Sequence, residues 1–162
     1  KIYELIENGV FSNTYSDSFD AFKQGGESTG NAIRQGSPMG RSAQPIPASC
    51  PHNLRITGKN EASREEIIEN TKHGLLVGRL WYTYAVNPTR GDFSCTARSG
   101  IRIIEDGEIK SPGKPVRIVH NLPVLLQNIS YIGNDEKNVL QWASLPSIAP
   151  TLRAEGIKVI PI

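Results

Sequence analysis

The pattern of apolar and polar positions is clearest in the middle of the chain, where two runs alternate with a period of two. In the first run, Arg79–Val86, one side carries Leu80, Tyr82, Tyr84 and Val86 and the other carries Trp81, Thr83 and Ala85. In the second, one side carries Phe93, Cys95, Ala97, Ile101 and Ile103 and the other carries Ser94, Thr96, Arg98 and Arg102. Alternation of this kind is typical of half-buried strands. We therefore predict two strands joined by a loop of about five residues, Asn87–Gly91, in which Pro88 fixes φ and Gly91 permits positive φ.

Two further hairpins are predicted from dipeptides that favour positive φ. Asn8-Gly9 lies between β-prone segments of Lys1–Ser16, and Asp106-Gly107 follows a similar Ile-Ile-Glu segment. Both dipeptides suit a type I′ turn, which matches the twist of the strands it joins. Additional strand-like runs are found at Pro51–Lys59, Lys114–Asn121 and Gly156–Ile162.

Helical spacing appears in three short stretches. The first, Ser16–Gly25, is capped by Asp17 or Ser18 and places Phe19 and Phe22 on one face. The second begins at the capping box Ser63–Glu66, continues to Lys72 or His73 and is ended by Gly74. The third is capped by Asn121 and runs over Leu122–Gly133, with an apolar stripe of Leu and Ile residues. These elements predict a β-rich α+β fold of antiparallel hairpins and sheets with about three short helices.

Length and composition add limits to this picture. The 162 residues suit one domain over residues 1–162, and we expect that domain to be a fragment of a longer chain, because it begins at Lys1 without an initiator Met. A formal net charge of +2 with scattered Lys and Arg gives no reason to expect a nucleic-acid partner. No run is long enough to span a membrane, so we expect no membrane partner. The two cysteines are best explained as thiols in a reducing compartment, which favours a cytoplasmic location.

One segment departs from both periodicities. Gly25–Pro51 is rich in Gly, Ser and Pro. The simplest interpretation is a long surface loop, although loops of this length are often functional lids or binding loops. Its role stays open at this point, with ordering on assembly as the functional alternative.

Candidate chemistry in the residues themselves is sparse. Arg90-Gly91-Asp92 spells an adhesion tripeptide, but turns favour Gly and Asp, so we interpret it as part of a turn. A nucleophile would be Ser94 or Cys95 with His120, and strand alternation allows only one of the first two to face that histidine. Cys50-x-His52 lacks a second ligand pair at zinc spacing, so we expect no metal site within this segment.

The order of motifs along the chain is more informative than any one of them. The segments Gly74–Val77, Gly91–Ser94 and Ile104–Ile109, with Gly100, Pro112, Asn121-Leu122 and Gly133–Asp135, closely resemble the C-terminal region of the TldD/PmbA family. The Asn8-Gly9 hairpin and Ser28–Arg34 also resemble it, so the likeness covers nearly the whole chain. Members of that family are related to zinc-dependent peptidases that pair as homo- or heterodimers and cut unstructured peptides, and they were first described as modulators of DNA gyrase.

The resemblance implies that the metal-binding residues of the parent protein come from more than one region of its chain. In catalytic members a His-Glu-x-x-x-His segment lies upstream, and a Cys between the Gly-Asn-Asp and Ser-Leu-Pro segments completes the zinc site. This sequence lacks both, and Asn138 or Trp142 stands where the Cys is expected. We therefore assign no metal ligand and no catalytic residue to this chain, and we leave open whether the parent is an enzyme that binds Zn²⁺.

The resemblance leads to two functional hypotheses. The first is a C-terminal domain that builds the dimer and the wall of a peptide cavity, with an exposed strand edge holding extended peptide. The residues expected to line that cavity are Asn87, Gly91, Asp92, Ser94, Gly133, Asn134 and Asp135. The alternative is a non-catalytic partner, scaffold or regulator that binds protein without cleaving it.

Overall fold

The computed structural model describes residues 2–34, 43–139 and 146–162, which divide into two compact units. Unit 1 comprises residues 1–56 and 137–149, and unit 2 comprises residues 57–136 and 150–162. Three helices and mostly antiparallel strands in the described residues confirm the β-rich α+β class. The sequence prediction of a single domain stays a prediction.

Unit 1 is built from very short elements. The hairpin β1 (Ile6–Glu7) and β2 (Val10–Phe11) turns at Asn8 and Gly9, whose φ angles of 51° and 79° confirm the predicted turn residues. A second pair joins β3 (Ala32–Ile33) to β4 (Ala48–Ser49). A third sheet has the order β12 (Lys137–Val139), β13 (Ser147–Ala149), β5 (Leu54–Arg55), so the expected strand over Pro51–Lys59 is reduced to two residues. Part of the Gly25–Pro51 segment, residues 35–42, lies outside the described residues.

Helix α1 (Ser18–Gln24) confirms the first predicted helix. The Asp17 carboxylate accepts a hydrogen bond from the Asp20 amide, and Gly25 ends the helix in the left-handed conformation. The side chains of the two phenylalanines of this helix are exposed to solvent: Phe19 is 63% exposed and Phe22 is 84% exposed.

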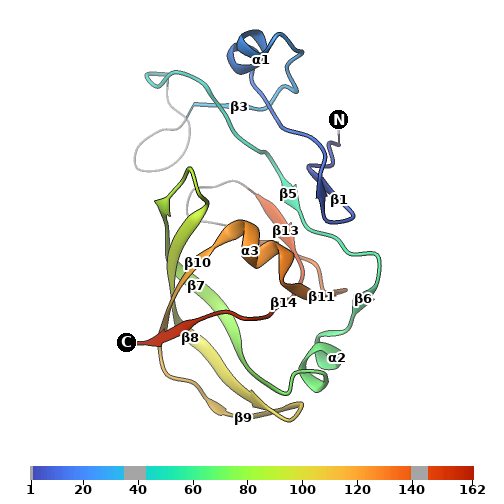
Figure 1. Ribbon diagram of the computed structural model, residues 1–162, viewed down its shortest axis with the longest axis vertical. Helices are drawn as coiled ribbons and strands as arrows, with labels where there is room; N and C mark the ends of the chain where they lie inside the picture. Colours follow the sequence, from blue (N-terminus) through green and yellow to red (C-terminus); the bar gives the residue numbers. More distant parts are fainter. Residues whose placement is uncertain (1, 35–42, 140–145) are drawn as a thin grey trace. The chain divides into compact units, whose positions relative to one another are not determined.

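Unit 2 contains a five-stranded antiparallel sheet whose longest members are β7 (His73–Asn87) and β8 (Asp92–Glu105). The order is β15 (Val159–Pro161), β10 (Val116–Asn121), β8, β7, and β9 (Glu108–Pro112) also pairs with β8. Figure 1 shows β7 and β8 as a long ribbon through this unit. One face of the sheet packs a core of Ala97, Ile101 and Val116, with Leu75 and Val77 against it.

The predicted alternation along Arg79–Val86 is wrong, because a bulge interrupts it. Trp81 lies opposite Thr96 and Tyr84 lies opposite Ser94, so two β7 residues stand against one on β8. Tyr82 has φ of 50°, which a tyrosine rarely adopts outside such an irregularity. Since Ser94 and Thr96 are two apart on one strand, Trp81 and Tyr84 point to the same face of the sheet rather than to opposite faces.

Helix α2 (Arg64–Glu69) begins as predicted, with the Ser63 hydroxyl accepting from the Glu66 amide, but it ends earlier than Lys72. The carbonyls of Thr71 and Lys72 accept instead from the amides of Gly107 and Asp106 in the β8–β9 turn, at 3.0 and 2.8 Å. This contact with the turn ends the helix, and β7 begins at His73, so Gly74 is not its terminator.

The predicted third helix, Leu122–Gly133, is correct only in its first half. Asn121 caps α3 (Leu122–Gln127), Asn128 ends it, and the chain continues as β11 (Ile129–Gly133). β11 pairs antiparallel with β14 (Leu152–Ala154) and parallel with β6 (Glu61–Ala62). These pairings satisfy the backbone on both sides of β11, and they depend on residues far away in sequence.

Candidate functional site

The tip of the β7–β8 hairpin is fastened to the start of α3 by Asn121. Its side-chain amide donates to the Arg90 carbonyl at 2.7 Å and to the Asp92 carboxylate at 2.9 Å, while its oxygen accepts from the Val124 amide. The Leu122 amide donates to the Gly91 carbonyl. A Cβ on Gly91, whose φ is 78°, would lie 2.8 Å from the Pro123 ring. Three hydrogen bonds, two from Asn121 and one from Leu122, tie down the Arg-Gly-Asp turn, so the turn is a structural corner.

Asn87 shapes the same turn. Both its side-chain oxygen and its carbonyl accept from the Arg90 amide at 3.2 Å, as its position before a proline predicts. The sequence placed Asn87, Gly91 and Asp92 together correctly. The sequence predicted Asn121 only as the cap of a helix. Its hydrogen bonds to Arg90 and Asp92 were not predicted, because the sequence around a cap residue does not indicate that its side-chain amide also reaches another loop.

Ser94 and Cys95 lie on opposite faces of β8. Ser94 stands opposite Tyr84 and Val119, away from the core, whereas Cys95 is 1% exposed and shares the face of His120. Burial raises the pKa of the Cys95 thiol, which is the reverse of what an activated thiolate needs. In the part of the chain that the structure describes, the buried His120 Nε2 has no hydrogen-bond partner. These residues do not assemble a nucleophilic site.

Gly133, Asn134 and Asp135 form a second corner, held by different partners. The Asp135 carboxylate accepts from the Thr151 amide at 2.7 Å and from the Thr151 hydroxyl at 2.8 Å. The amide of Gly133 donates to the Thr151 carbonyl, and that of Asn134 to the Ala62 carbonyl. These hydrogen bonds fix the conformation of the turn over Gly133–Asp135, so they have a structural role. Our expectation that both corners line one substrate cavity remains a prediction.

The β7 edge of the large sheet is a long stretch of unpaired backbone in the described part of unit 2. Over residues 2–34, 43–139 and 146–162, β7 pairs with β8 alone, so its other side has no strand partner along 15 residues. The side chains beside that edge are apolar and exposed: Leu80, Tyr82, Tyr84 and Val86 at 47, 55, 63 and 63%. A long, apolar, unpaired edge is a template for another extended chain.

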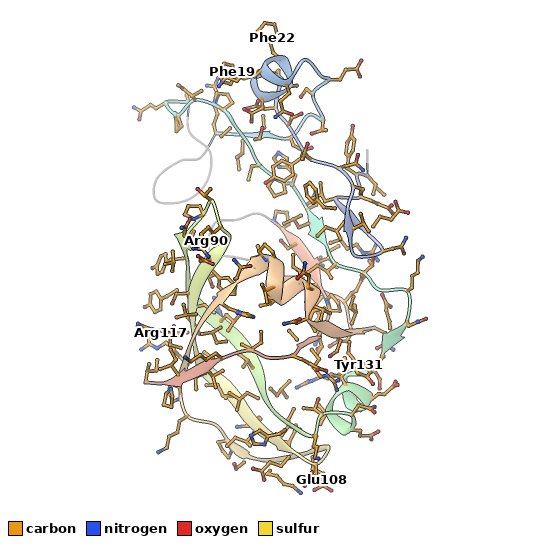
Figure 2. All side chains as sticks on the ribbon, viewed as in Figure 1. Phe19, Phe22, Arg90, Glu108, Arg117 and Tyr131 are labelled. Carbon is orange, nitrogen blue, oxygen red and sulfur yellow. The ribbon has the colours of Figure 1, made fainter. Side chains whose placement is uncertain are left out.

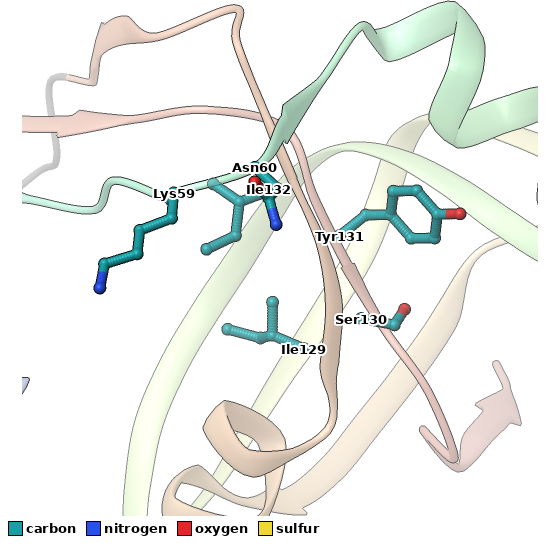
Figure 3. Close-up of a pocket in the computed structure, with 7 residues that line it drawn as sticks. Lys59, Asn60, Ile129, Ser130, Tyr131 and Ile132 are labelled. Atoms are coloured by element: carbon teal, nitrogen blue, oxygen red, sulfur yellow. The ribbon is translucent and has the colours of Figure 1, made fainter. Parts of the chain in front are cut away.

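A shallow pocket of about 250 Å³ lies elsewhere in unit 2, between Gly58–Asn60 and β11. Figure 3 shows Lys59 extending away from Tyr131, with Ile129 and Ile132 between them. Its Ser130 hydroxyl is already engaged, since it accepts from the Arg153 Nε at 2.8 Å. The hydrogen bond from Arg153 also lowers the pKa of Glu155. The pocket brings no acid and base together.

The side chains that could bind a metal ion are scattered over the described residues. The described residues contain no group of three or more His, Cys, Asp or Glu side chains that could hold one. The His52 Nε2 lies 3.1 Å from the Ala32 carbonyl, and Cys95 is a buried thiol. Asn138 lies in β12, opposite Ile148, and Trp142 lies outside the described residues. No helix in the described ranges is long and apolar enough to cross a membrane.

The described residues thus form a β-rich set of sheets in which one long strand edge is unpaired. Residues 1–161 match the family model of the PmbA/TldA metallopeptidase C-terminal domain. The chain belongs to the PmbA/TldD family and represents its C-terminal domain.

Three relatives illustrate the match. A "Metalloprotease" of Methanothermobacter thermautotrophicus is 33% identical over 134 residues, which are 81% of this chain and 27% of that protein. The crystal structure of TldE from Thermococcus kodakarensis is similar with a TM-score of 0.78 and 30% identity, over 96% of this chain and 33% of that one. A Thermotoga maritima protein described as a candidate modulator of a DNA gyrase is similar with a TM-score of 0.71 and 28% identity, over 96% and 32%. The chain thus spans only about a quarter to a third of the length of these relatives.

Proposed function

We propose that this domain forms one wall of a peptide-binding cavity in a TldD/PmbA-type metalloprotease and contributes to its dimer scaffold. Unstructured peptides are held in extended form along β7 while the parent protein cleaves them. The observation that carries this proposal is the unpaired 15-residue edge of β7 in the described residues.

An open edge suits such substrates because its amides and carbonyls bind any extended backbone, whatever its sequence. An unstructured peptide supplies that backbone without first unfolding. The exposed tyrosines of β7 offer apolar contact to alternate side chains of the added strand. The metalloprotease names of relatives support a role in proteolysis.

The chemistry itself belongs to the rest of the parent protein in this proposal. Zn²⁺ bound there would activate a water molecule, and this chain supplies binding and positioning. The partner is a second TldD/PmbA-type subunit, as the similarity to TldE favours, and the location is the cytoplasm.

The test uses the full-length protein and a fluorescent 12-residue peptide of unstructured sequence, with binding measured by anisotropy. Two further peptides carry N-methyl groups at either the odd or the even residues. A strand pairs through every second amide, so one methylated peptide should bind at least about tenfold more weakly while the other binds normally. Equal binding of all three peptides would exclude pairing along a strand edge.

A non-catalytic partner or regulator is the second candidate, because Asn138 lies in the segment where the family resemblance expects a metal-binding Cys. Elemental analysis of the full-length protein, alone and with its partner subunit, separates the two. About one zinc per chain with cleavage of unstructured peptides supports the enzyme. Cleavage that appears only with a zinc-loaded partner supports the non-catalytic subunit.

A further inference from the structure

The outer face of the large sheet, opposite its core, is defined by the strand register. One row across β7, β8 and β10 is Trp81, Thr96 and Arg117, and the next is Tyr84, Ser94 and Val119. Residues directly opposite one another on neighbouring strands point to the same face. Ala97 and Val116 form an opposed pair on the other face, where the core lies. Figure 2 shows Arg117 projecting away from the sheet.

Arginines and aromatic rings alternate on this outer face. The guanidinium carbon of Arg79 lies 4.0 Å from the centre of the Trp81 ring, and that of Arg98 lies 5.7 Å from the Tyr82 ring. Tyr82 stacks on Tyr84 with 6.4 Å between ring centres. We call this surface the arginine–aromatic face, made of Arg79, Trp81, Tyr82, Tyr84, Arg98 and Arg117. The rings hold the guanidinium groups of Arg79 and Arg98 in place, and among the described residues these two groups have no hydrogen-bond partner.

Charge between the ends of these strands has one sign, and the Asp92 carboxylate at the start of β8 is already engaged by Asn121 and Arg90. The segments 78–86, 93–104, 114–121 and 156–162 contain no Asp or Glu, although the chain has 16 acidic residues in all. Their charged side chains are all cations: Arg79, Arg98, Arg102, Lys114, Arg117 and Lys158. In the described residues, the three arginines of the arginine–aromatic face form no ion pair. The surface is therefore complementary to an anionic partner.

We propose that the peptides held along β7 are selected for acidic side chains, which the arginine–aromatic face recognises. This inference rests on the proposed function, because it places the peptide as a strand beside β7. In that position every second side chain lies over the outer face. A carboxylate there reaches Arg79 on the adjacent strand and Arg98 on the next, and guanidinium groups bind carboxylates with paired hydrogen bonds.

A single-stranded nucleic acid is the other anionic polymer that aromatic rings and arginines can bind. It does not form the regular ladder of alternating amides and carbonyls that a peptide strand forms along the β7 edge, whereas a peptide uses the edge and the face together. The open edge beside the face therefore favours an acidic peptide.

The experiment measures three fluorescent 12-residue peptides against the full-length protein by anisotropy, at about 0.15 M salt. Their sequences alternate Ala with Glu, Gln or Lys. Each exposed ion pair contributes about a two- to fivefold change in affinity, so the Glu peptide should bind at least about fivefold more tightly than the Gln peptide. The Lys peptide should bind more weakly than both.

Variants of the arginines test which of them cause the preference for the Glu peptide. Arg79→Gln and Arg98→Gln should each reduce the Glu-over-Gln preference by about two- to fivefold, and together they should abolish it. Arg117→Gln, one strand further from the edge, should have a smaller effect. Arg64→Gln on α2, an exposed arginine outside the sheet, is the matched control and should leave the preference unchanged. Thermal melts by circular dichroism confirm that each variant is folded.

The outcomes are distinguishable. Equal binding of the three peptides overturns the acidic preference but leaves the proposed peptide-binding function intact. Failure of all three to bind overturns both. A preference for Glu that survives in the Arg79→Gln, Arg98→Gln double variant overturns the assigned surface. Tighter binding of a 12-nucleotide single-stranded DNA, lost in the same variants, would assign the face to nucleic acid instead.

Discussion

Asp135 shows, at the scale of one residue, how a residue of a sequence motif can be structural. Its carboxylate accepts from both the amide and the hydroxyl of Thr151 and thereby closes the turn after β11. We expect Asp135→Ala to lower the free energy of unfolding by about 1–3 kcal/mol, because two half-buried donors lose their acceptor. Urea denaturation measures the loss. Asn134→Ala, at the exposed neighbouring position, is the control and should change stability by less than about 0.5 kcal/mol. Equal stability of the two variants would contradict the structural role.

Turn residues were predictable one by one, because their conformations are set locally. Asn8 and Asp106 adopt positive φ before Gly9 and Gly107, as the Asn-Gly and Asp-Gly dipeptides indicate. The positive φ of Tyr82 was not predictable, since nothing in tyrosine favours it. It follows from the register between β7 and β8, which is a property of two strands together. The same bulge brings Trp81 and Tyr84 onto one face and so creates the arginine–aromatic face.

At the scale of elements, the contact between α2 and the β8–β9 turn fixes where the helix ends. Gly107 has φ of +80°, and a Cβ there would lie 2.6 Å from the Glu69 carbonyl oxygen. Gly107→Ala should therefore combine backbone strain of about 1–2 kcal/mol with a steric cost of about 1–3 kcal/mol. Gly156→Ala is the matched control in unit 2, because its φ is +69° but its Cβ would meet only the Asn128 amide, at 3.8 Å. We expect Gly107→Ala to be the more destabilising by at least about 1 kcal/mol in urea denaturation. If both variants lose the same amount, the turn does not pack tightly on the helix.

The exchange of helix for strand after Asn128 shows the limit of periodicity. Leu122, Leu125, Leu126, Ile129 and Ile132 are spaced as in a helix, yet the last two lie in β11. Isoleucine and tyrosine favour strands, and the backbone of Ile132 lies between β14 and β6. Those partners come from segments at residues 61–62 and 152–154, so no local window contains the information. The pairing of residues 129–133 with β14 and β6 therefore makes this segment a strand and not a helix.

At the scale of the whole molecule, the two units differ in how much they bury. The buried apolar residues of unit 2 include Cys95, Ala97, Ile101, Ile104 and Val116, whereas among the described residues of unit 1 only Ala21 is a buried apolar side chain. The fold class and the family were predictable from the order of motifs. The division into units was not, because it depends on which short strands pair across long sequence separations, such as β5 with β13.

This difference predicts how stability is distributed. In the 162-residue chain, amide hydrogen exchange should be slow in β8 and fast in α1, since a helix with few buried contacts opens easily. Phe19 and Phe22 expose most of their surface, and the relatives are about three times as long as this chain. Figure 2 shows both rings directed away from α1. Burying such a ring against the rest of the parent protein stabilises by about 1.5–3 kcal/mol. Exchange in α1 should therefore slow at least about tenfold in the full-length protein, while β8, the internal control, changes little. Mass spectrometry of both forms measures the difference, and equal exchange of α1 in the two would mean that its phenylalanines stay exposed to solvent.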